Sequence, residues 1–182
     1  GGQQARSGAF CDLHRMAVTL LAERAADNAR FLVLGAGGGL ELKAFTQARP
    51  DWTFVGVDPS QPMLDLAAQV LGPHVSQVEL IHGYIDDAPV GPFDGATRLL
   101  MLHFLPVPDR LDVLRALKDR LKPGAPLIIA HHCNPGVGPA EDWLARSVAF
   151  ANGPMADAKS ARASVTSMAQ HLTLLTAQQE EA

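Results

Sequence analysis

The stretch that decides the fold reads FLVLGAGGG and covers residues 31–39. Its apolar first part is typical of a strand that is buried on both faces of a parallel sheet. The glycines that follow give the chain a tight turn whose backbone can pass close to a ligand, and a helical pattern begins at Leu40. Free N–H groups at the start of that helix can receive a carboxylate or a phosphate. The stretch therefore predicts a strand, a glycine loop and a helix at the ligand-binding edge of an α/β sheet.

The alternation of strand and helix continues along the chain. Strands are predicted over 31–34, 53–57, 78–81, 97–102 and 127–130. A leading helix is predicted over 10–26, with an apolar stripe through Leu13, Met16, Ala17, Leu20 and Leu21. Further helices are predicted over 40–48, from the N-cap Ser60 to Gly72, and through Leu111, Leu114, Leu117 and Leu121. Such alternation with short connections predicts a Rossmann-like, doubly wound α/β sheet of about five parallel strands, with helices on both faces.

The pattern changes beyond Asn134. A helix is predicted over 140–150, a weak helical stripe runs through 158–170, and 172–176 is a candidate short strand. We interpret 134–170 as a helical insertion over the substrate site, where Trp143, Phe150, Met155 and Met168 either form an apolar lid or pack helices together. Thr176 followed by Gln179 is a capping-box arrangement that announces a further helix. We therefore expect one domain over 1–182 that is truncated at its carboxyl end.

Composition narrows the classes of function. A chain of 182 residues with 47% hydrophobic residues can bury one core. The net charge of −4 disfavours binding to nucleic acid or to an anionic membrane. Two cysteines make neither a disulfide scaffold nor a zinc pair, and no apolar run has the length of a membrane span. We therefore expect a cytoplasmic protein that acts on a small molecule and has no nucleic-acid, membrane or metal partner.

An acidic residue ends the second predicted strand. Asp58 lies 23 residues after Gly35, so both belong to the carboxyl edge of the sheet, where the carboxylate can accept hydrogen bonds from two ribose hydroxyls. A dinucleotide fingerprint that begins at Gly35 needs glycine or alanine at position 40, and this chain has Leu40. The pattern therefore favours a nucleoside-bearing cofactor other than NAD.

At this point the chain resembles the class I S-adenosylmethionine-dependent methyltransferases, over about residues 10–181. The matching blocks are VLGAGGG at 33–39, GVDPS at 56–60 with Met63 and Leu64, FD at 93–94, LHFL at 102–105 and LKPG at 121–124. The resemblance implies S-adenosyl-L-methionine as cofactor and methyl transfer to an O, N or C nucleophile of a small molecule. The family fold normally ends in a strand hairpin that this chain lacks, so we expect one sheet edge to be exposed or paired in a homodimer.

The resemblance also implies roles for single residues. Gly35, Ala36 and Gly37 would contact the methionine moiety, with Gly39 completing the loop, Asp58 would hold the ribose, and Pro59 and Met63 would lie near the adenine. The family often has an acid after the third strand, where this chain has Tyr84 and Ile85 and offers their backbone groups instead, with Asp86 and Asp87 slightly later. An aromatic residue near the cofactor in similar proteins makes Phe10 and His14 further candidates.

Methyl transfer from a sulfonium needs positioning and sometimes a base. The candidate bases are His103 after the fourth predicted strand and His131 and His132 at the end of the fifth, and each could instead be a rim residue without a catalytic part. Arg98, inside an apolar strand, could meet the cofactor carboxylate, an acidic substrate or an internal aspartate. His103 and Arg98 are therefore also candidates for cofactor binding. His131, His132 and Cys133 are not expected to bind a metal, because neighbours on a strand point to opposite faces.

Three alternatives to methyl transfer stay open. The first is a non-catalytic or regulatory module that binds the cofactor. The second is a related enzyme that makes a carboxylated derivative of the cofactor, for which Arg98 is the candidate extra cation. The third is an NAD-dependent oxidoreductase, against which Leu40 argues.

Overall fold

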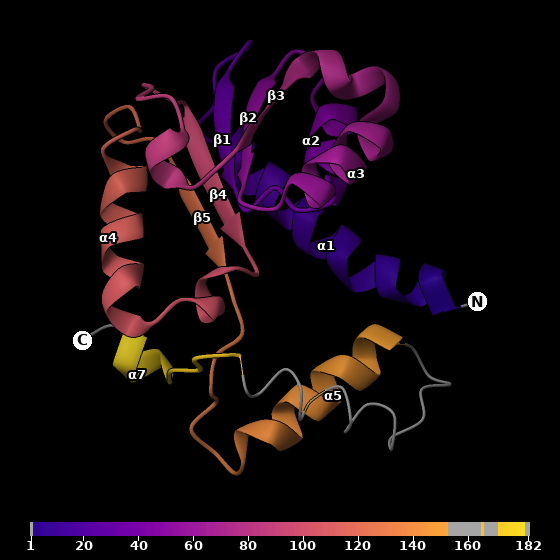
Figure 1. Ribbon diagram of the computed structural model, residues 1–182, viewed down its shortest axis with the longest axis vertical. Coiled ribbons are helices and arrows are strands. Elements are labelled where there is room, and N and C mark those ends of the chain that lie inside the picture. Colours follow the sequence, from indigo (N-terminus) through magenta and orange to yellow (C-terminus); the bar gives the residue numbers. More distant parts are fainter. Residues whose placement is uncertain (1, 153–164, 166–170, 181–182) are drawn as a thin grey trace.

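The computed structural model of this protein describes residues 2–152, 165 and 171–180. Its centre is one five-stranded sheet in the order β3-β2-β1-β4-β5, in which all neighbouring strands are parallel (Figure 1). The strands are β1 (Arg30–Leu34), β2 (Thr53–Asp58), β3 (Val78–His82), β4 (Gly95–Leu99) and β5 (Leu127–Ala130). The predicted Rossmann-like sheet is confirmed.

Helices cover both faces of this sheet. The helices α1 (Gly2–Ala22), α2 (Leu40–Ala48) and α3 (Gln61–Leu71) share one face, and α4 (Val107–Lys118) lies on the other (Figure 1). Beyond β5 the chain forms α5 (Ala140–Asn152), which contacts α1, and later the short α7 (Ala177–Glu180). Single 3₁₀ turns form η1 (Gly72–Gln77), η2 (Ile85–Asp87) and η3 (Leu102–Phe104). Within the described ranges no helix has the length and apolar character needed to cross a bilayer.

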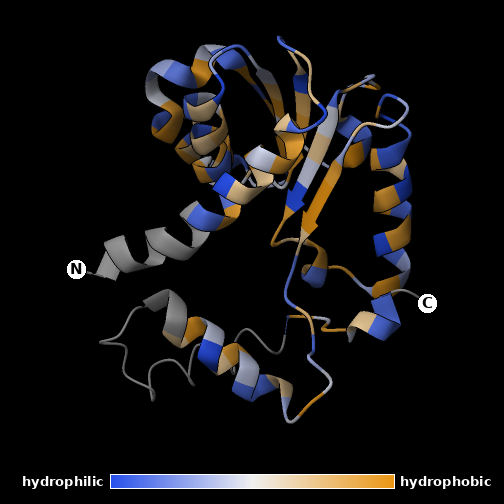
Figure 2. Ribbon diagram, turned by 180° about the vertical axis from the view of Figure 1, so that it is seen from behind, coloured by the Kyte–Doolittle hydropathy of each residue, from blue (hydrophilic) through white to orange (hydrophobic). Residues whose placement is uncertain are grey.

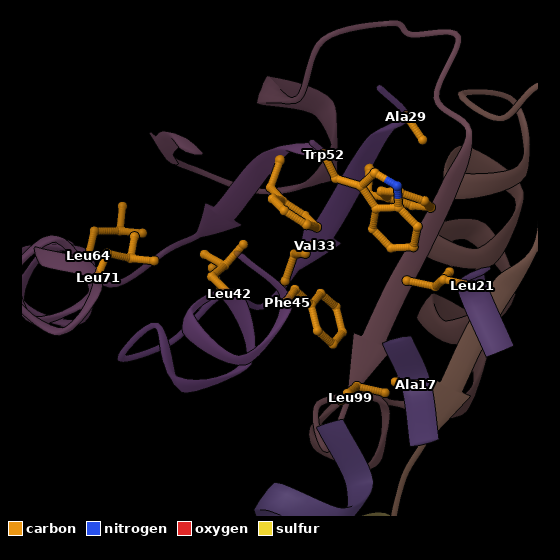
Figure 3. Packing of buried hydrophobic residues seen from close by; sticks show 13 residues of the cluster. Ala17, Leu21, Ala29, Val33, Leu42, Phe45, Trp52, Leu64, Leu71 and Leu99 are labelled. Atoms are coloured by element: carbon orange, nitrogen blue, oxygen red, sulfur yellow. The ribbon is translucent and has the colours of Figure 1, made fainter. Parts of the chain in front are cut away.

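The inner strands β1, β2 and β4 are buried on both faces because their side chains alternate between two cores, whereas the edge strands β3 and β5 are partly exposed. Phe31 and Val33 of β1 join an aromatic-rich core with Trp52 and Phe45 under α1 and α2 (Figure 3). The rings of Phe31 and Trp52 lie 4.4 Å apart between centroids. Leu32 points the other way, into the core under α4. Strand β5 stands out as apolar in Figure 2.

Two helices are rotated relative to the predicted stripes. In α1, Ala17 and Leu21 are buried as expected, but Met16 and Leu20 are exposed. In α4, Leu117 is buried, whereas Leu111 is exposed and Arg110 takes the inward position. Arg110 is inside because the carboxyl-terminal segment of the chain binds it, as described below.

The fourth strand lies earlier than predicted. It covers Gly95–Leu99 rather than 97–102. Leu100 has φ 57°, a left-handed conformation that is rare for a branched side chain, and it turns the chain out of the sheet into η3. Such backbone strain concentrates at functional sites.

The carboxyl-terminal segment is partly as predicted. Residues 172–176 form no strand, because Thr173 donates its N–H to the carbonyl of His103 (2.8 Å) and Leu175 accepts from Asn134 (2.8 Å) without forming a ladder. The capping box before α7 is confirmed: the N–H of Thr176 donates to Gln179 Oε1 (2.9 Å) and the N–H of Gln179 to Thr176 Oγ1 (3.3 Å). The weak helical stripe over 158–170 lies outside the described residues, apart from position 165.

Candidate functional site

The strand order changes direction between β1 and β4. From β1 the chain continues to β2 and β3 on one side, and it then crosses to β4 and β5 on the other. Open α/β sheets bind ligands beyond the carboxyl ends of the strands at such a point. Gly35 follows β1 and Met101 follows β4, and a Cβ placed on Gly35 would lie only 2.6 Å from Met101 Cγ. The glycine loop and the end of β4 therefore meet at the expected ligand site.

Three glycines of the loop have left-handed backbone, with φ values of 88° at Gly35, 49° at Gly37 and 78° at Gly39. At Gly39 an added Cβ would lie 2.8 Å from Ala67 Cα, so this glycine lets α2 approach α3 closely. At Gly37 an added Cβ would make only ordinary contacts, the nearest with Met63 Cε at 3.8 Å. Gly39 thus has a packing role, whereas at Gly37 it is the positive φ and not close packing that favours glycine.

We expect Gly39→Ala to destabilise the fold by at least about 2 kcal/mol, because the new methyl group overlaps the backbone of α3 and the residue keeps positive φ. Gly72→Ala is the matched control, since Gly72 also has positive φ (54°) but an added Cβ there meets nothing within 4 Å. The free energy of unfolding in urea measures both variants. Equal losses in the two variants would contradict the close approach of α3.

The N–H groups of the loop are already in use. Four of its five residues donate inside the protein: Gly35 and Ala36 to the carbonyl of Val57 (2.8 and 3.1 Å), Gly37 to Asp58 Oδ2 (2.8 Å) and Gly39 to the carbonyl of Ala36 (3.1 Å). The expectation that free N–H groups would receive a carboxylate or a phosphate is therefore wrong for these positions. A pyrophosphate needs such donors, so the loop is poorly suited to a dinucleotide.

Asp58 lies at the centre of the carboxyl edge and is 5% exposed. Its two oxygens accept N–H groups from Gly37 (2.8 Å) and Ser60 (2.9 Å). An ionised carboxylate offers about four acceptor positions, so about two stay available for the hydroxyls of a ribose. The observed geometry fits the role that was predicted for this residue.

The other predicted cofactor residues border the same edge. Met63 is half-exposed at the start of α3, and the carbonyl of Pro59 accepts a hydrogen bond from His82 Nε2 (2.9 Å). Tyr84 is exposed, and its N–H donates to the carboxylate of Asp87 (2.8 Å). That N–H is therefore not available to an adenine, whereas the exposed Tyr84 ring is.

The residues predicted for the site do not include a buried acid that the structure places under the glycine loop. Glu41, in the first turn of α2, is 7% exposed and accepts a hydrogen bond from Thr97 Oγ1 of β4. Burial raises the pKa of Glu41 to about 7. Thr97 pairs in register with Val33, two residues before Gly35, which places the acid just beneath the loop. The sequence offered one signal, an acid in the first turn of the helix that follows the glycine loop. In the structure its apolar neighbour Leu40 is the exposed residue (61%), and the acid is the buried one.

The structure brings the three predicted histidines together. His103 is buried, and its Nδ1 accepts the backbone N–H of His132 (3.0 Å), which assigns the ring proton to Nε2. The rings of His103 and His132 lie 4.9 Å apart. Burial lowers the pKa of His103 to about 4, and the nearby charges of His132, His131, Arg110 and Arg98 add to this effect. His103 is therefore neutral at physiological pH.

His131 belongs to an ion-pair network that the sequence did not reveal. Its Nε2 donates to Glu180 Oε1 (3.0 Å), and the buried Arg110 donates to the same oxygen through Nη1 (2.5 Å). Arg110 also donates to the carbonyl of Thr173. These contacts hold the segment 171–180 over the end of β5. No spacing rule could have found a pair 70 residues apart.

Arg98 has no partner among the described residues, so of its three candidate partners an internal aspartate is not seen in this part of the chain, and the cofactor carboxylate and an acidic substrate stay open. The residue is 7% exposed, and its Nε is buried without a hydrogen bond. Alternation along β4 places it on the face of Ala96, toward α4. Burial lowers the pKa of Arg98 to about 10, which leaves it charged at neutral pH. An unpaired buried cation is costly, and an anionic ligand would relieve that cost.

A cavity of about 280 Å³ opens beyond β5. His131, His132 and Cys133 line one side of it, and Trp143, Leu144 and Ser147 of α5 line the other. Part of the predicted insertion thus faces the rim, while the side chains of Phe150, Met155 and Met168 lie outside the description. Among the described residues no group of three His, Cys, Asp or Glu side chains could hold a metal ion. His14 of α1 is buried, which lowers its pKa, and the side chain of Phe10 is not described.

Known proteins are similar to this chain in sequence or in architecture. A carboxy-S-adenosyl-L-methionine synthase of Actinobacillus succinogenes is 32% identical over 120 residues, which are 63% of this chain and 49% of that protein. The chain therefore spans about half the length of this curated relative. A SAM-bound amino pentose methyltransferase of Micromonospora echinaspora has a TM-score of 0.59 at 24% identity, over 70% of this chain and 52% of that one. The [4+2]-cyclase SpnF has a TM-score of 0.64 at 20% identity, over 92% and 53%.

The sequence also matches a family profile described as a methyltransferase domain over residues 32–127, from β1 to the start of β5. This match covers more than half of the chain. It includes the glycine loop, Asp58 and the segment after β4, the three features that meet at the switch point. The chain therefore belongs to the methyltransferase domain family.

Proposed function

We propose that this chain binds S-adenosyl-L-methionine and transfers its methyl group to an O, N or C nucleophile of a small molecule. The observation that carries the proposal is Asp58, which keeps about two acceptor positions beside Gly37 at the switch point. A nucleoside with a ribose diol matches these positions. The N–H groups of the loop that already donate inside the protein weigh against a pyrophosphate, and they leave the methionine carboxylate of this cofactor to be held by other groups.

When bound, the cofactor supplies a methyl group on a positively charged sulfur. The protein has three tasks in this proposal. Asp58 accepts the ribose hydroxyls, and Gly35 and Gly37 give the backbone room for the methionine end. His103 is already a hydrogen-bond acceptor for the backbone of His132, so His132 beyond β5 is the histidine that we propose to border the acceptor and to take up its proton. Positioning of the two reactants then provides most of the rate enhancement.

Two other functions use the same site. A binding module would hold the cofactor without turnover, and the fold alone does not decide this, since a cyclase shares it. Synthesis of a carboxylated cofactor is favoured by the unpaired Arg98, which could meet the added carboxylate, and by the relative of that activity. An oxidoreductase is disfavoured by Leu40 and by the occupied N–H groups.

Methyl-labelled S-adenosylmethionine tests the proposal. We expect the chain to transfer label to a fraction of a small-molecule extract and to release S-adenosylhomocysteine in equal amount. Cofactor binding without any labelled product across a broad set of acceptors would support a binding module and contradict methyl transfer. A preference for carboxy-S-adenosylmethionine over the parent cofactor that Arg98→Met removes would support the carboxylated alternative.

We also propose that the acceptor is a small molecule and that the protein is cytoplasmic. We further propose that residues 1–182 form one domain and that two copies pair as a homodimer. The net charge of −4 supports the absence of a nucleic-acid partner. The edge strand β5, which pairs only with β4 among the described residues, supports pairing with a second copy. Sedimentation equilibrium would measure the oligomeric state.

A further inference from the structure

The cavity beyond β5 is joined to the glycine loop by one short segment. Met101 touches Gly35 at the cofactor edge, and two residues later His103 contacts His132 in the wall of the cavity. The turn through η3 therefore links the two places, which both lie beyond the carboxyl ends of the strands. A molecule in the cavity thus lies at the same edge of the sheet as the proposed cofactor site.

The cavity has a flat apolar side. Trp143 is 42% exposed, and its indole N–H donates to the carbonyl of Val137 (2.8 Å), so the ring is held in place and its polar group is satisfied. Arg146 covers one face of this ring, with Cζ 4.5 Å from a ring centroid. Leu144 continues the apolar lining. A rigid aromatic wall of this kind suits a planar ring.

The opposite side is polar but carries little charge. Among the described residues none hydrogen-bonds to the ring nitrogens of His132, whose pKa is lowered by burial and by the charge of His131. His132 is therefore neutral with a nitrogen free to accept a proton. His131 is engaged by Glu180, and Cys133 and Ser147 add uncharged polar groups. Among the residues that the structure describes, neither Lys nor Arg nor Asp nor Glu lines the cavity.

The charges behind this wall are mostly positive. Arg110 is paired with Glu180, whereas Arg98 has no partner within the described part of the chain, and both lower the pKa of the neighbouring His103. The same field disfavours a cationic ligand and stabilises an anion that forms during the reaction. A neutral hydroxyl that becomes an oxyanion as it loses its proton meets both conditions. An amine that is charged at neutral pH does not.

We infer that the cavity is the acceptor site and takes a small, uncharged hydroxyaromatic compound, with His132 as the group that accepts the hydroxyl proton. This inference rests on the proposed function. The oxygen attacks the methyl carbon while its proton passes to the free ring nitrogen of His132. The carbon–sulfur bond breaks and its electron pair goes to sulfur, which yields the methyl ether, neutral S-adenosylhomocysteine and a protonated imidazole. The cavity volume of about 280 Å³ limits the acceptor to about one or two rings.

The probe 4-nitrophenol tests the site without cofactor, because it quenches tryptophan fluorescence and its anion absorbs visible light. We expect the chain to bind it, with an apparent pKa of the bound phenol below that of the free phenol. Trp143→Ala should weaken binding at least about tenfold. His132→Leu should slow methyl transfer to the probe at a pH where the bound phenol is neutral, while binding of the probe falls less, and it should have little effect where the bound probe is already the anion. His74→Gln, on the far edge of the sheet, is the matched control and should change neither binding nor methyl transfer.

Several results would overturn the inference. They are no binding of 4-nitrophenol, binding that neither Trp143→Ala nor His132→Leu affects, and tighter binding of benzylamine than of 4-nitrophenol. Thermal unfolding of each variant shows whether it is folded, and Trp143→Phe, which keeps an aromatic wall, should retain binding. The proposed function fails separately: if S-adenosylhomocysteine does not bind but 4-nitrophenol does, the cavity stands and the cofactor assignment falls.

Discussion

Replacing Asp58 by asparagine is expected to weaken the binding of S-adenosylhomocysteine by at least about 100-fold. The carboxylate accepts N–H groups from Gly37 and Ser60 and keeps acceptor positions for a ribose. An amide has only one acceptor oxygen, and its NH₂ group faces an N–H donor of the loop. Hydrogen bonds to a charged acceptor contribute about 1.5–3 kcal/mol each, and a loss of about 3 kcal/mol is a factor of about 100 in affinity.

Titration calorimetry of both proteins measures this effect. Asp51→Asn is the matched control, because this substitution removes the same charge. Asp51 is exposed just before β2, at the other end of the same strand. It should leave the affinity unchanged. A loss of affinity as large in Asp51→Asn as in Asp58→Asn would show that net charge matters and that the proposed contact does not.

Replacing Glu41 by glutamine is expected to stabilise the protein at alkaline pH, by about 3 kcal/mol at pH 8. Burial raises the pKa of Glu41 from 4.5 to about 7. Between these values the folded state binds more protons than the unfolded state, so this group makes the free energy of unfolding fall as pH rises. The difference of about 2.5 pKa units corresponds to about 3 kcal/mol above pH 7. Glutamine does not titrate and can still accept from Thr97.

Urea unfolding at pH 5.5 and at pH 8 measures the prediction. The advantage of Glu41→Gln over the natural sequence should grow by about 2 kcal/mol between these two pH values. Glu23→Gln, at an exposed position just after α1, should show no such growth. An advantage for Glu41→Gln that is equal at both pH values would mean that Glu41 is ionised in the folded protein throughout this range.

Local sequence patterns predicted the scaffold because each strand is short, apolar and followed by a clear stop. The helix 40–48 and the strand 127–130 were predicted with the observed bounds. The fourth strand was misplaced because its end depends on Leu100, whose positive φ no propensity favours. The stripe of α4 was wrong because the contact of Arg110 with Glu180 outweighs the burial of Leu111.

The candidate site was predictable where it depends on backbone geometry. Glycines after a strand and an acid at the end of the next strand identify the cofactor edge from spacing alone. Glu41 could not be found this way, because its burial depends on Thr97, which is distant in sequence. The use of the loop N–H groups was also hidden, since it depends on how β1 and β2 lie in register. Residues that act through distant partners need the fold before they can be recognised.

The most direct test of the central claim is a side-by-side calorimetric titration of this chain with S-adenosylhomocysteine and with NAD. Asp58 offers acceptor positions for a ribose, while four N–H groups of the glycine loop donate to acceptors inside the protein. We therefore expect S-adenosylhomocysteine to bind at a single site and NAD not to bind. Binding of NAD, or no binding of S-adenosylhomocysteine to a chain shown to be folded, would contradict it.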